Sequence, residues 1–210
     1  MGMFKVIGIT GKARSGKDTV AQDIFDLCTR TGKAWVEVRP IALPIKLMME
    51  TLLEPFSSSY DDLDDMLYGK SKEYTLAPFG KSPRQMMQTL GTDWGRDMVS
   101  KSIWLDLANK EIRCLRKRSL EATIPYLYVI PDVRFANELE ICDTIINVTR
   151  PSDTELAGAT ATHASETSNF GAAYDYQLRN TGSLDYLSAR VRYILPALLA
   201  EETTDVANTG

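Results

Sequence analysis

A glycine-bounded loop near the N-terminus restricts the possible folds more than any other segment. Residues 4–10 are apolar and rich in β-branched side chains, which predicts a buried strand ahead of the loop. Residues 18–30 carry apolar side chains at helical spacing and predict a helix that ends at Gly32. Residues 35–38 predict a second strand. Because a strand, a helix and a strand in this order form a βαβ unit, we expect a parallel sheet and an α/β fold.

The loop has the spacing GxxxxGK of a phosphate-binding loop (P-loop), with the ammonium group of Lys17 expected on the β- and γ-phosphates of ATP. Glycines let backbone N–H groups wrap around phosphates, and the following helix adds the positive end of its dipole. Asp18 stands where Ser or Thr usually binds Mg²⁺, and we expect its carboxylate to hold Mg²⁺ directly or through a water. The predicted ATP-binding residues are Gly11, Lys12, Arg14, Ser15, Gly16, Lys17, Asp18, Thr19 and Arg150, for which a surface role is the alternative.

Composition and charge exclude some classes of function. The 210 residues include 24 Lys and Arg against 28 Asp and Glu, a net charge of −4, which argues against a binder of nucleic acid or of membrane surfaces. No signal peptide and no membrane helix is predicted, so we expect a cytoplasmic protein. We interpret Cys28, Cys114 and Cys142 as buried structural thiols. The single histidine, His163, excludes a multi-histidine metal site.

Several classes of protein share such a loop. A GTPase should carry an NKxD motif at a strand end, but Asn109-Lys110 falls inside a predicted helix and lacks the aspartate. A motor or helicase ATPase needs a longer chain. A small-molecule kinase fits the length best, and it needs cationic groups for two phosphate-bearing ligands, a carboxylate for magnesium or the acceptor, and a lid that excludes water.

Candidate groups for this chemistry follow a third predicted strand at 126–130. Asp132 lies just beyond the C-terminal end of that strand, where α/β folds place ligands, and Arg134 and Glu138 come after it. We predict that Asp132 assists the metal or the acceptor and that Arg134 binds a phosphate. These two residues and Lys17 are the predicted catalytic groups. A structural salt bridge between Arg134 and Glu138 is the alternative.

A second group of candidates lies in a predicted helix at 83–99 and in the helix after it, at 103–118. Arg84 and Gln88 are four residues apart and share one helix face. Gly91-Thr92 would allow the close approach of a ligand. Trp104 is predicted either to stack on a base or to belong to the core, two interpretations of equal weight.

These segments together resemble the deoxynucleoside monophosphate kinases of tailed bacteriophages. The resemblance extends from about Phe4 to Leu199 and is carried by GKARSGKDT at 11–19, RQMMQTLGTDWGR at 84–96, Trp104, DVRFANE at 132–138 and HASE at 163–166. In that family ATP and Mg²⁺ convert dTMP, dGMP and similar monophosphates to diphosphates for phage DNA synthesis, and a homodimer is suggested. The resemblance implies that Ser15, Lys17, Asp18 and Thr19 serve ATP and magnesium. It implies an acceptor site of Arg84, Gln88, Gly91, Thr92, Trp104, Asp132, Arg134 and Glu138.

The expected fold is therefore an α/β P-loop NTPase, similar to nucleoside monophosphate kinases, with a mostly parallel five-stranded sheet. Further strands are predicted at 144–149 and 176–179, and other helices at 43–53, 61–68, 135–141 and 184–199. We expect one domain over 1–200 with a helical acceptor-binding insertion at 55–120, a lid at 150–174 that contains His163, and a flexible tail at 201–210. Rival functions are a kinase of the dephospho-CoA or phosphomevalonate type and a P-loop ATPase switch without transferase activity.

Overall fold

The computed structural model describes residues 2–150 and 174–200, and the chain divides into two compact units. Unit 1 contains Met1–Arg39 and Ile112–Gly210, and unit 2 contains Pro40–Glu111. Most of the predicted lid, with His163, and the predicted tail lie outside the described residues. Within the described ranges, no helix has the length and apolar character that crossing a bilayer requires.

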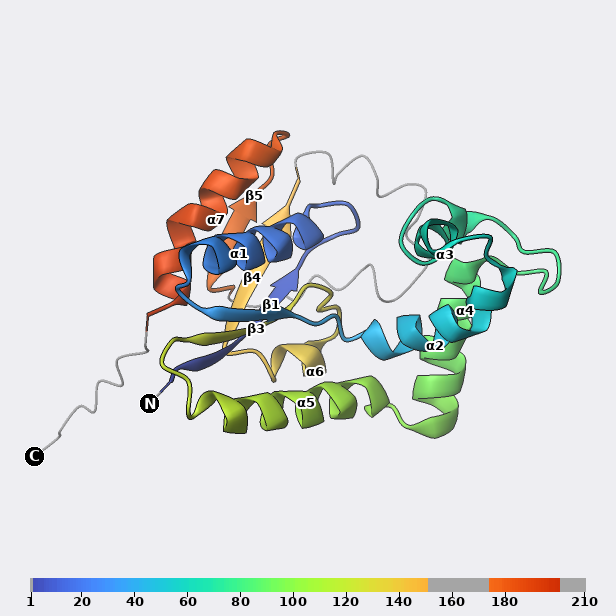
Figure 1. Ribbon diagram of the computed structural model, residues 1–210, viewed down its shortest axis with the longest axis horizontal. Helices are drawn as coiled ribbons and strands as arrows, with labels where there is room; N and C mark the ends of the chain where they lie inside the picture. The colour runs from blue at the N-terminus through green and yellow to red at the C-terminus, as the bar shows by residue number, and fades with distance from the viewer. Residues whose placement is uncertain (1, 151–173, 201–210) are drawn as a thin grey trace, which may run out of the picture. The chain divides into compact units, whose positions relative to one another are not determined.

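Unit 1 is built on a five-stranded sheet in the order β2-β3-β1-β4-β5 (Figure 1). The strands are β1 (Phe4–Thr10), β2 (Trp35–Val38), β3 (Tyr126–Ile130), β4 (Thr144–Thr149) and β5 (Tyr176–Arg179). All four strand pairings are parallel, so the carboxyl ends of the strands meet at one edge. The predicted five-stranded sheet is confirmed, and each strand has the predicted bounds.

The main core lies on the face of the sheet that two helices cover, α1 (Lys17–Thr31) and α7 (Leu184–Leu198). Figure 1 shows these helices side by side along that face. Ile7 and Ile9 of β1 are fully buried in this core, together with Ile24 of α1 and Leu187 of α7. The alternation of a strand sends Gly8 to the opposite face. There a Cβ on Gly8 would lie only 2.5 Å from Sγ of Cys142, so this position has no room for a side chain.

The opposite face holds α6 (Ala136–Leu139) and the C-terminal part of α5 (Ile103–Ser119). The Arg116 guanidinium of α5 lies 5.2 Å from the ring centroid of Phe4 and 3.7 Å from the carboxylate of Asp143. Asp143 in turn accepts a hydrogen bond from the backbone N–H of Val6 at 2.7 Å. These contacts tie the end of α5 to the beginning of the central strand.

The three cysteines differ in exposure. Cys28 is buried, as predicted, and Cys142 is half-buried. The prediction is wrong for Cys114, which is exposed because its side of α5 faces solvent while Ile112 and Leu115 are turned inward. Burial, with the nearby charges of Asp143 and Glu138, raises the pKa of Cys142 to about 12. Burial also raises the pKa of Cys28.

We expect a maleimide reagent at pH 8 to modify Cys114 first. The reactive species is the thiolate, and a thiol with a pKa near 12 is ionised at pH 8 in only about one molecule in 10⁴. Peptide mass spectrometry over a time course measures the order of labelling. Cys142 labelled as fast as Cys114 in the folded protein would contradict the described burial, and labelling in denaturant provides the control in which all three thiols react.

Unit 2 is helical and has a small core of its own. Its elements are α2 (Leu43–Leu53), η1 (Glu54–Phe56), α3 (Tyr60–Leu67), η2 (Ser71–Glu73), α4 (Pro83–Thr89) and η3 (Leu90–Val99), followed by the first residues of α5. Met49, Leu53, Leu63, Met66 and Leu67 form the buried cluster of this unit.

The predicted helix over 83–99 is confirmed, but its winding changes after Thr89. The chain continues as a π-helix, η3, whose wider turns differ from the α-helical repeat of the sequence pattern. The indole of Trp104 packs here so closely that a Cβ on Gly95 would lie 2.4 Å from its ring. The Trp104 Nε1–H group also donates to the Gly91 carbonyl at 2.7 Å. The helix therefore changes its winding where a large side chain from α5 packs against two glycines.

Candidate active site

The P-loop begins directly after β1 and passes too close to β4 to carry a side chain at its first position. A Cβ on Gly11 would lie 2.2 Å from the backbone oxygen of Val148, and the φ angle of Gly11 is +142°. Arg14 and Gly16 also have positive φ angles, of 62° and 109°. Alternation between left-handed and ordinary backbone turns N–H groups to one side of a loop, which makes a concave anion site.

The side chain of Lys17 folds back into the P-loop and bonds to its backbone. Its Nζ donates hydrogen bonds to the carbonyl oxygen of Gly11 at 2.7 Å and to that of Lys12 at 2.8 Å. Lys17 is also the first residue of α1, so its charge lies at the positive end of the helix. No side chain caps the N-terminus of α1 within the described chain. The first amide groups of this helix are therefore available to an anion.

Ser15 contributes a buried hydroxyl to the same loop. The residue is fully buried, and among the described residues Oγ of Ser15 has no hydrogen-bond partner. Buried polar atoms are nearly always paired, so such an atom usually marks the place of a ligand or a water. This group strengthens the prediction that the P-loop binds phosphate.

The structure brings Asp132 to the same edge of the sheet as the P-loop. The backbone N–H of Val133, the next residue, donates to the carbonyl oxygen of Ile9 at 3.3 Å, one residue before the end of β1. Asp132 is half-buried at this position. A carboxylate and a phosphate-binding loop therefore lie at the ends of neighbouring strands, as the sequence predicts.

Glu138 has a structural function in this region. It is buried, and its Oε2 accepts hydrogen bonds from the backbone N–H groups of Arg134 at 2.7 Å and of Phe135 at 3.1 Å. This contact joins the Glu138 carboxylate to backbone N–H groups, so the alternative of a salt bridge between the Arg134 and Glu138 side chains stays a prediction. Arg134 itself is exposed, so its guanidinium is accessible to a ligand. A role of Glu138 at the acceptor stays a prediction.

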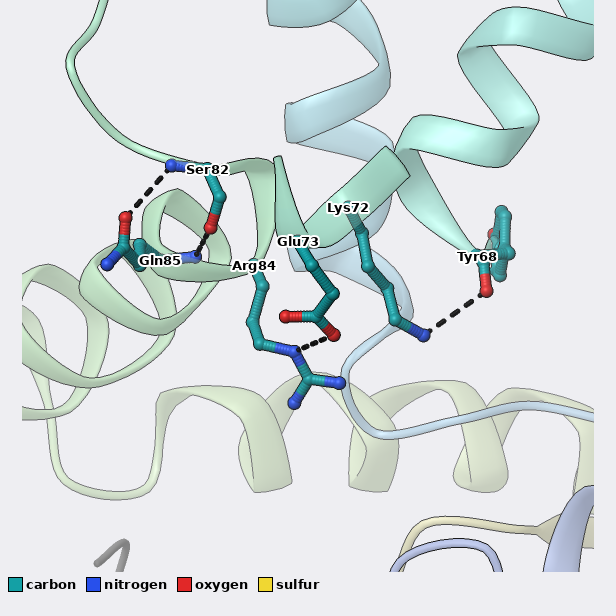
Figure 2. Close-up of polar contacts among 6 residues, drawn as sticks. All are labelled: Tyr68, Lys72, Glu73, Ser82, Arg84 and Gln85. Carbon is teal, nitrogen blue, oxygen red and sulfur yellow. Dashed lines mark hydrogen bonds and ion pairs between the residues drawn. The ribbon is translucent and has the colours of Figure 1, made fainter. Parts of the chain in front are cut away.

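The other predicted acceptor residues belong to unit 2. Figure 2 shows Arg84 at the start of α4, where its Nε lies 2.8 Å from Oε1 of Glu73. Beside it, Ser82 and Gln85 form a capping box that fixes the beginning of the helix. Gln88 is half-buried and Thr92 is exposed. The ion pair of Arg84 is therefore held on a rigid helix start and remains accessible.

Trp104 and Gly91 are explained by packing. Trp104 is 3% exposed, and its indole N–H group bonds to the Gly91 carbonyl, so the core interpretation describes its observed environment. A Cβ on Gly91 would lie 2.9 Å from Cδ1 of Ile45, which accounts for the glycine without a ligand. Contact of either residue with an acceptor base stays a prediction.

The described residues contain no group of three or more His, Cys, Asp or Glu side chains that would hold a metal ion. Asp18 lies in the first turn of α1, and Thr19 follows it. Arg150, the last predicted ATP-binding residue, is half-buried directly after β4.

Asn180 lies at the same edge of the sheet, and its sequence context does not single it out. It directly follows β5 and is 2% exposed. Its Nδ2 donates a hydrogen bond to the Ser15 carbonyl oxygen at 2.8 Å. In the sequence, Asn180 precedes Thr181 and Gly182 and so looks like an ordinary turn residue.

Comparison with known proteins places this arrangement in a family. A family model described as deoxynucleotide monophosphate kinase matches residues 79–191, more than half of the chain. The chain belongs to the deoxynucleotide monophosphate kinase family. A deoxynucleoside-5'-monophosphate kinase of Escherichia phage T5 is 27% identical, with 66% of this chain and 72% of the phage protein covered. The solved structure of TT1252 from Thermus thermophilus is 18% identical, covers 94% of this chain and 100% of its own, and has a TM-score of 0.45.

Membership of the deoxynucleotide monophosphate kinase family makes the chain a nucleotide-binding phosphotransferase. The matched residues include the predicted acceptor residues, Asp132 to Glu138 and Asn180. The P-loop precedes the matched segment, so its assignment depends on the GxxxxGK spacing and on the geometry of Gly11, Ser15 and Lys17. Family and loop geometry are thus independent lines of support for one type of enzyme.

Proposed function

We propose that this deoxynucleotide monophosphate kinase transfers the γ-phosphoryl group of ATP, bound at residues 11–19, to the 5′-phosphate of a deoxynucleoside monophosphate. An oxygen of the acceptor phosphate forms a bond to the γ-phosphorus while the bond from this phosphorus to the β,γ-bridging oxygen breaks. The products are ADP and a deoxynucleoside diphosphate. The observation that carries the proposal is a P-loop whose buried Ser15 hydroxyl has no hydrogen-bond partner within the described part of the chain, at the sheet edge that also holds Asp132.

Phosphoryl transfer asks the protein mainly for positioning and charge neutralisation. Lys17 would exchange the two loop carbonyls for phosphate oxygens, which are stronger acceptors because they are charged. The uncapped N-terminus of α1 and Ser15 Oγ would receive other phosphate oxygens. Arg134 would balance the charge that accumulates between donor and acceptor.

The residues present fit a magnesium ion that binds together with ATP. Mg²⁺ usually binds through one or two carboxylates and substrate phosphates and keeps several waters, so it needs no cage of protein ligands. Asp18 would hold it, with Thr19 as a second oxygen donor. When bound, the ion neutralises charge on the β- and γ-phosphates.

Arg84 of unit 2 and Arg134 of unit 1 are each proposed to bind the acceptor phosphate, and Asp132 is proposed to act on the reacting groups. Gln88, which is half-buried, and Thr92, which is exposed, are proposed to contact the nucleoside part of the acceptor. The product would supply DNA synthesis in the cytoplasm of a bacteriophage's host, which agrees with the phage source of the curated relative.

Replacement of Arg84 by Gln should raise the KM for the acceptor about tenfold or more, because a charged contact to phosphate is lost. The KM for ATP should stay near the wild-type value. Glu73→Gln is the matched control, since it breaks the same ion pair from the other side. That pair is exposed on both sides, so its loss should change the free energy of unfolding by only ~0.5 kcal/mol. Equal effects of both variants on the acceptor KM would contradict a phosphate contact of Arg84.

A panel of acceptors tests the proposed substrate class. ADP release from ATP and Mg²⁺ is measured with the four deoxynucleoside monophosphates, their ribonucleotide counterparts, dephospho-CoA and phosphomevalonate. Strong stimulation by at least one deoxynucleotide is expected. Stimulation only by a non-nucleotide acceptor would support the rival kinases, and ATP hydrolysis that no acceptor changes would support a P-loop switch.

A further inference from the structure

We propose that Asn180 is a positioning residue that sets the shape of the P-loop for nucleotide binding. This inference rests on the proposed function, because it assigns Asn180 an effect on ATP that acts through the loop. Asn180 lies 165 positions from Ser15 in the sequence, yet its side-chain amide bonds to the Ser15 carbonyl in a buried place. Asn180 itself is not proposed to contact a substrate.

The amide of Asn180 is fixed at both of its ends. While Nδ2 donates to Ser15, Oδ1 accepts a hydrogen bond from the backbone N–H of Gly182 at 3.3 Å. The Asn180 backbone N–H also donates to the Thr149 carbonyl at 2.7 Å, which holds the residue beside the end of β4. Because the Ser15 carbonyl can only accept and the Gly182 N–H can only donate, these two partners fix which end of the Asn180 amide is Nδ2, and the Nδ2 donor faces the P-loop.

The Ser15 carbonyl controls the next amide group of the loop. The peptide that joins Ser15 to Gly16 is trans, so its N–H points to the side opposite its carbonyl oxygen. A carbonyl held by the buried Asn180 therefore directs the Gly16 N–H away from the protein interior. This is the direction from which a phosphate would approach the start of α1.

Gly16 leaves the space that the contact between Asn180 and Ser15 requires. A Cβ on Gly16 would lie 2.8 Å from Asn180 Nδ2 and 3.1 Å from Cδ2 of Leu187 in α7. The glycine of the P-loop thus gives space to the asparagine amide as well as to its own positive φ angle of 109°. A side chain at position 16 would therefore displace the Asn180 amide from its contact with the loop.

The inference predicts a selective effect on ATP. In Asn180→Ala the Ser15–Gly16 peptide loses its fixed orientation, and the dissociation constant for ATP should rise about tenfold, the size of one good hydrogen bond. The KM for the deoxynucleoside monophosphate should stay within about twofold. Asn180→Asp keeps an acceptor for the Gly182 N–H but removes the donor to Ser15, so its ATP affinity should fall at least as far.

Calorimetric titration of ATP into the full chain, with steady-state kinetics and thermal melting, tests this. Ser183→Ala is the control, because Ser183 Oγ caps α7 three residues away by accepting from the Tyr186 N–H at 3.1 Å. This control should lower the melting temperature and leave ATP affinity unchanged. Wild-type ATP affinity in both Asn180 variants, with ATP affinity weakened in Lys17→Ala, would overturn the inference and leave the proposed function standing. The inference would also be overturned if the Asn180 variants lost affinity for ATP and for the acceptor equally and in proportion to their fall in melting temperature, because that pattern indicates general destabilisation. Failure of the wild-type chain to bind ATP would overturn both proposals.

Discussion

Lys17→Ala should lower kcat by about 10³-fold or more while the fold remains intact. The wild-type ammonium group lies inside the P-loop, within 2.8 Å of two carbonyl oxygens. Its removal takes away a positive charge where negative charge develops on the transferring group. Steady-state rates at saturating ATP and acceptor measure the loss, and circular dichroism checks the fold.

Lys33→Ala is a suitable control for Lys17→Ala. Lys33 is exposed just beyond the other end of α1, so its replacement removes the same charge far from the P-loop. Its kcat should stay near the wild-type value. A Lys17→Ala enzyme with a near-normal rate would remove the P-loop from the mechanism.

Gly11→Ala should abolish nucleotide binding and lower the free energy of unfolding by about 2–4 kcal/mol. An added Cβ would lie 2.2 Å from the backbone oxygen of Val148, and the φ angle of +142° is strained for any other residue. Neither obstacle is relieved by turning a side chain, so the beginning of the P-loop must move away from β4. Denaturant unfolding and ATP titration measure the two effects.

Gly32→Ala separates backbone strain from damage to the P-loop. Gly32 has a φ angle of +61°, and a Cβ there would meet nothing within 4 Å. This variant should cost only ~1 kcal/mol and leave ATP binding and turnover unchanged. Normal ATP affinity in Gly11→Ala would contradict the described packing of the loop against β4.

The sheet follows from the sequence because its strands are short runs rich in β-branched, aromatic or other apolar side chains, separated by polar or glycine-rich segments. All five have the predicted bounds, and the GxxxxGK spacing places the P-loop at the end of the central one. The helix at 83–99 also follows from the sequence, but its change to π-helical winding after Thr89 does not, because the apolar repeat alone does not show that Trp104 packs against Gly91 and Gly95. The predicted burial of Cys114 is wrong for a similar reason, because the sequence pattern alone does not show which side of α5 is turned inward.

Residues of the candidate site can be predicted from the sequence only where they belong to a local motif. Lys17 and Asp132 are found from loop spacing and from a strand end. Asn180 is not, because its contact with Ser15 joins segments 165 residues apart and its neighbours resemble a common turn. The function of Glu138 also depends on geometry, since only the structure shows that its carboxylate binds two backbone N–H groups.

Transfer of labelled phosphate tests the proposed reaction most directly. The chain is incubated with ATP labelled at the γ-phosphate, Mg²⁺ and the deoxynucleoside monophosphate that stimulates ADP release most, and the products are separated by chromatography. We predict that the label appears in the deoxynucleoside diphosphate, one equivalent for each ADP formed, and that Lys17→Ala gives almost none. Label that appears only as inorganic phosphate would contradict the assignment of phosphoryl transfer between nucleotides.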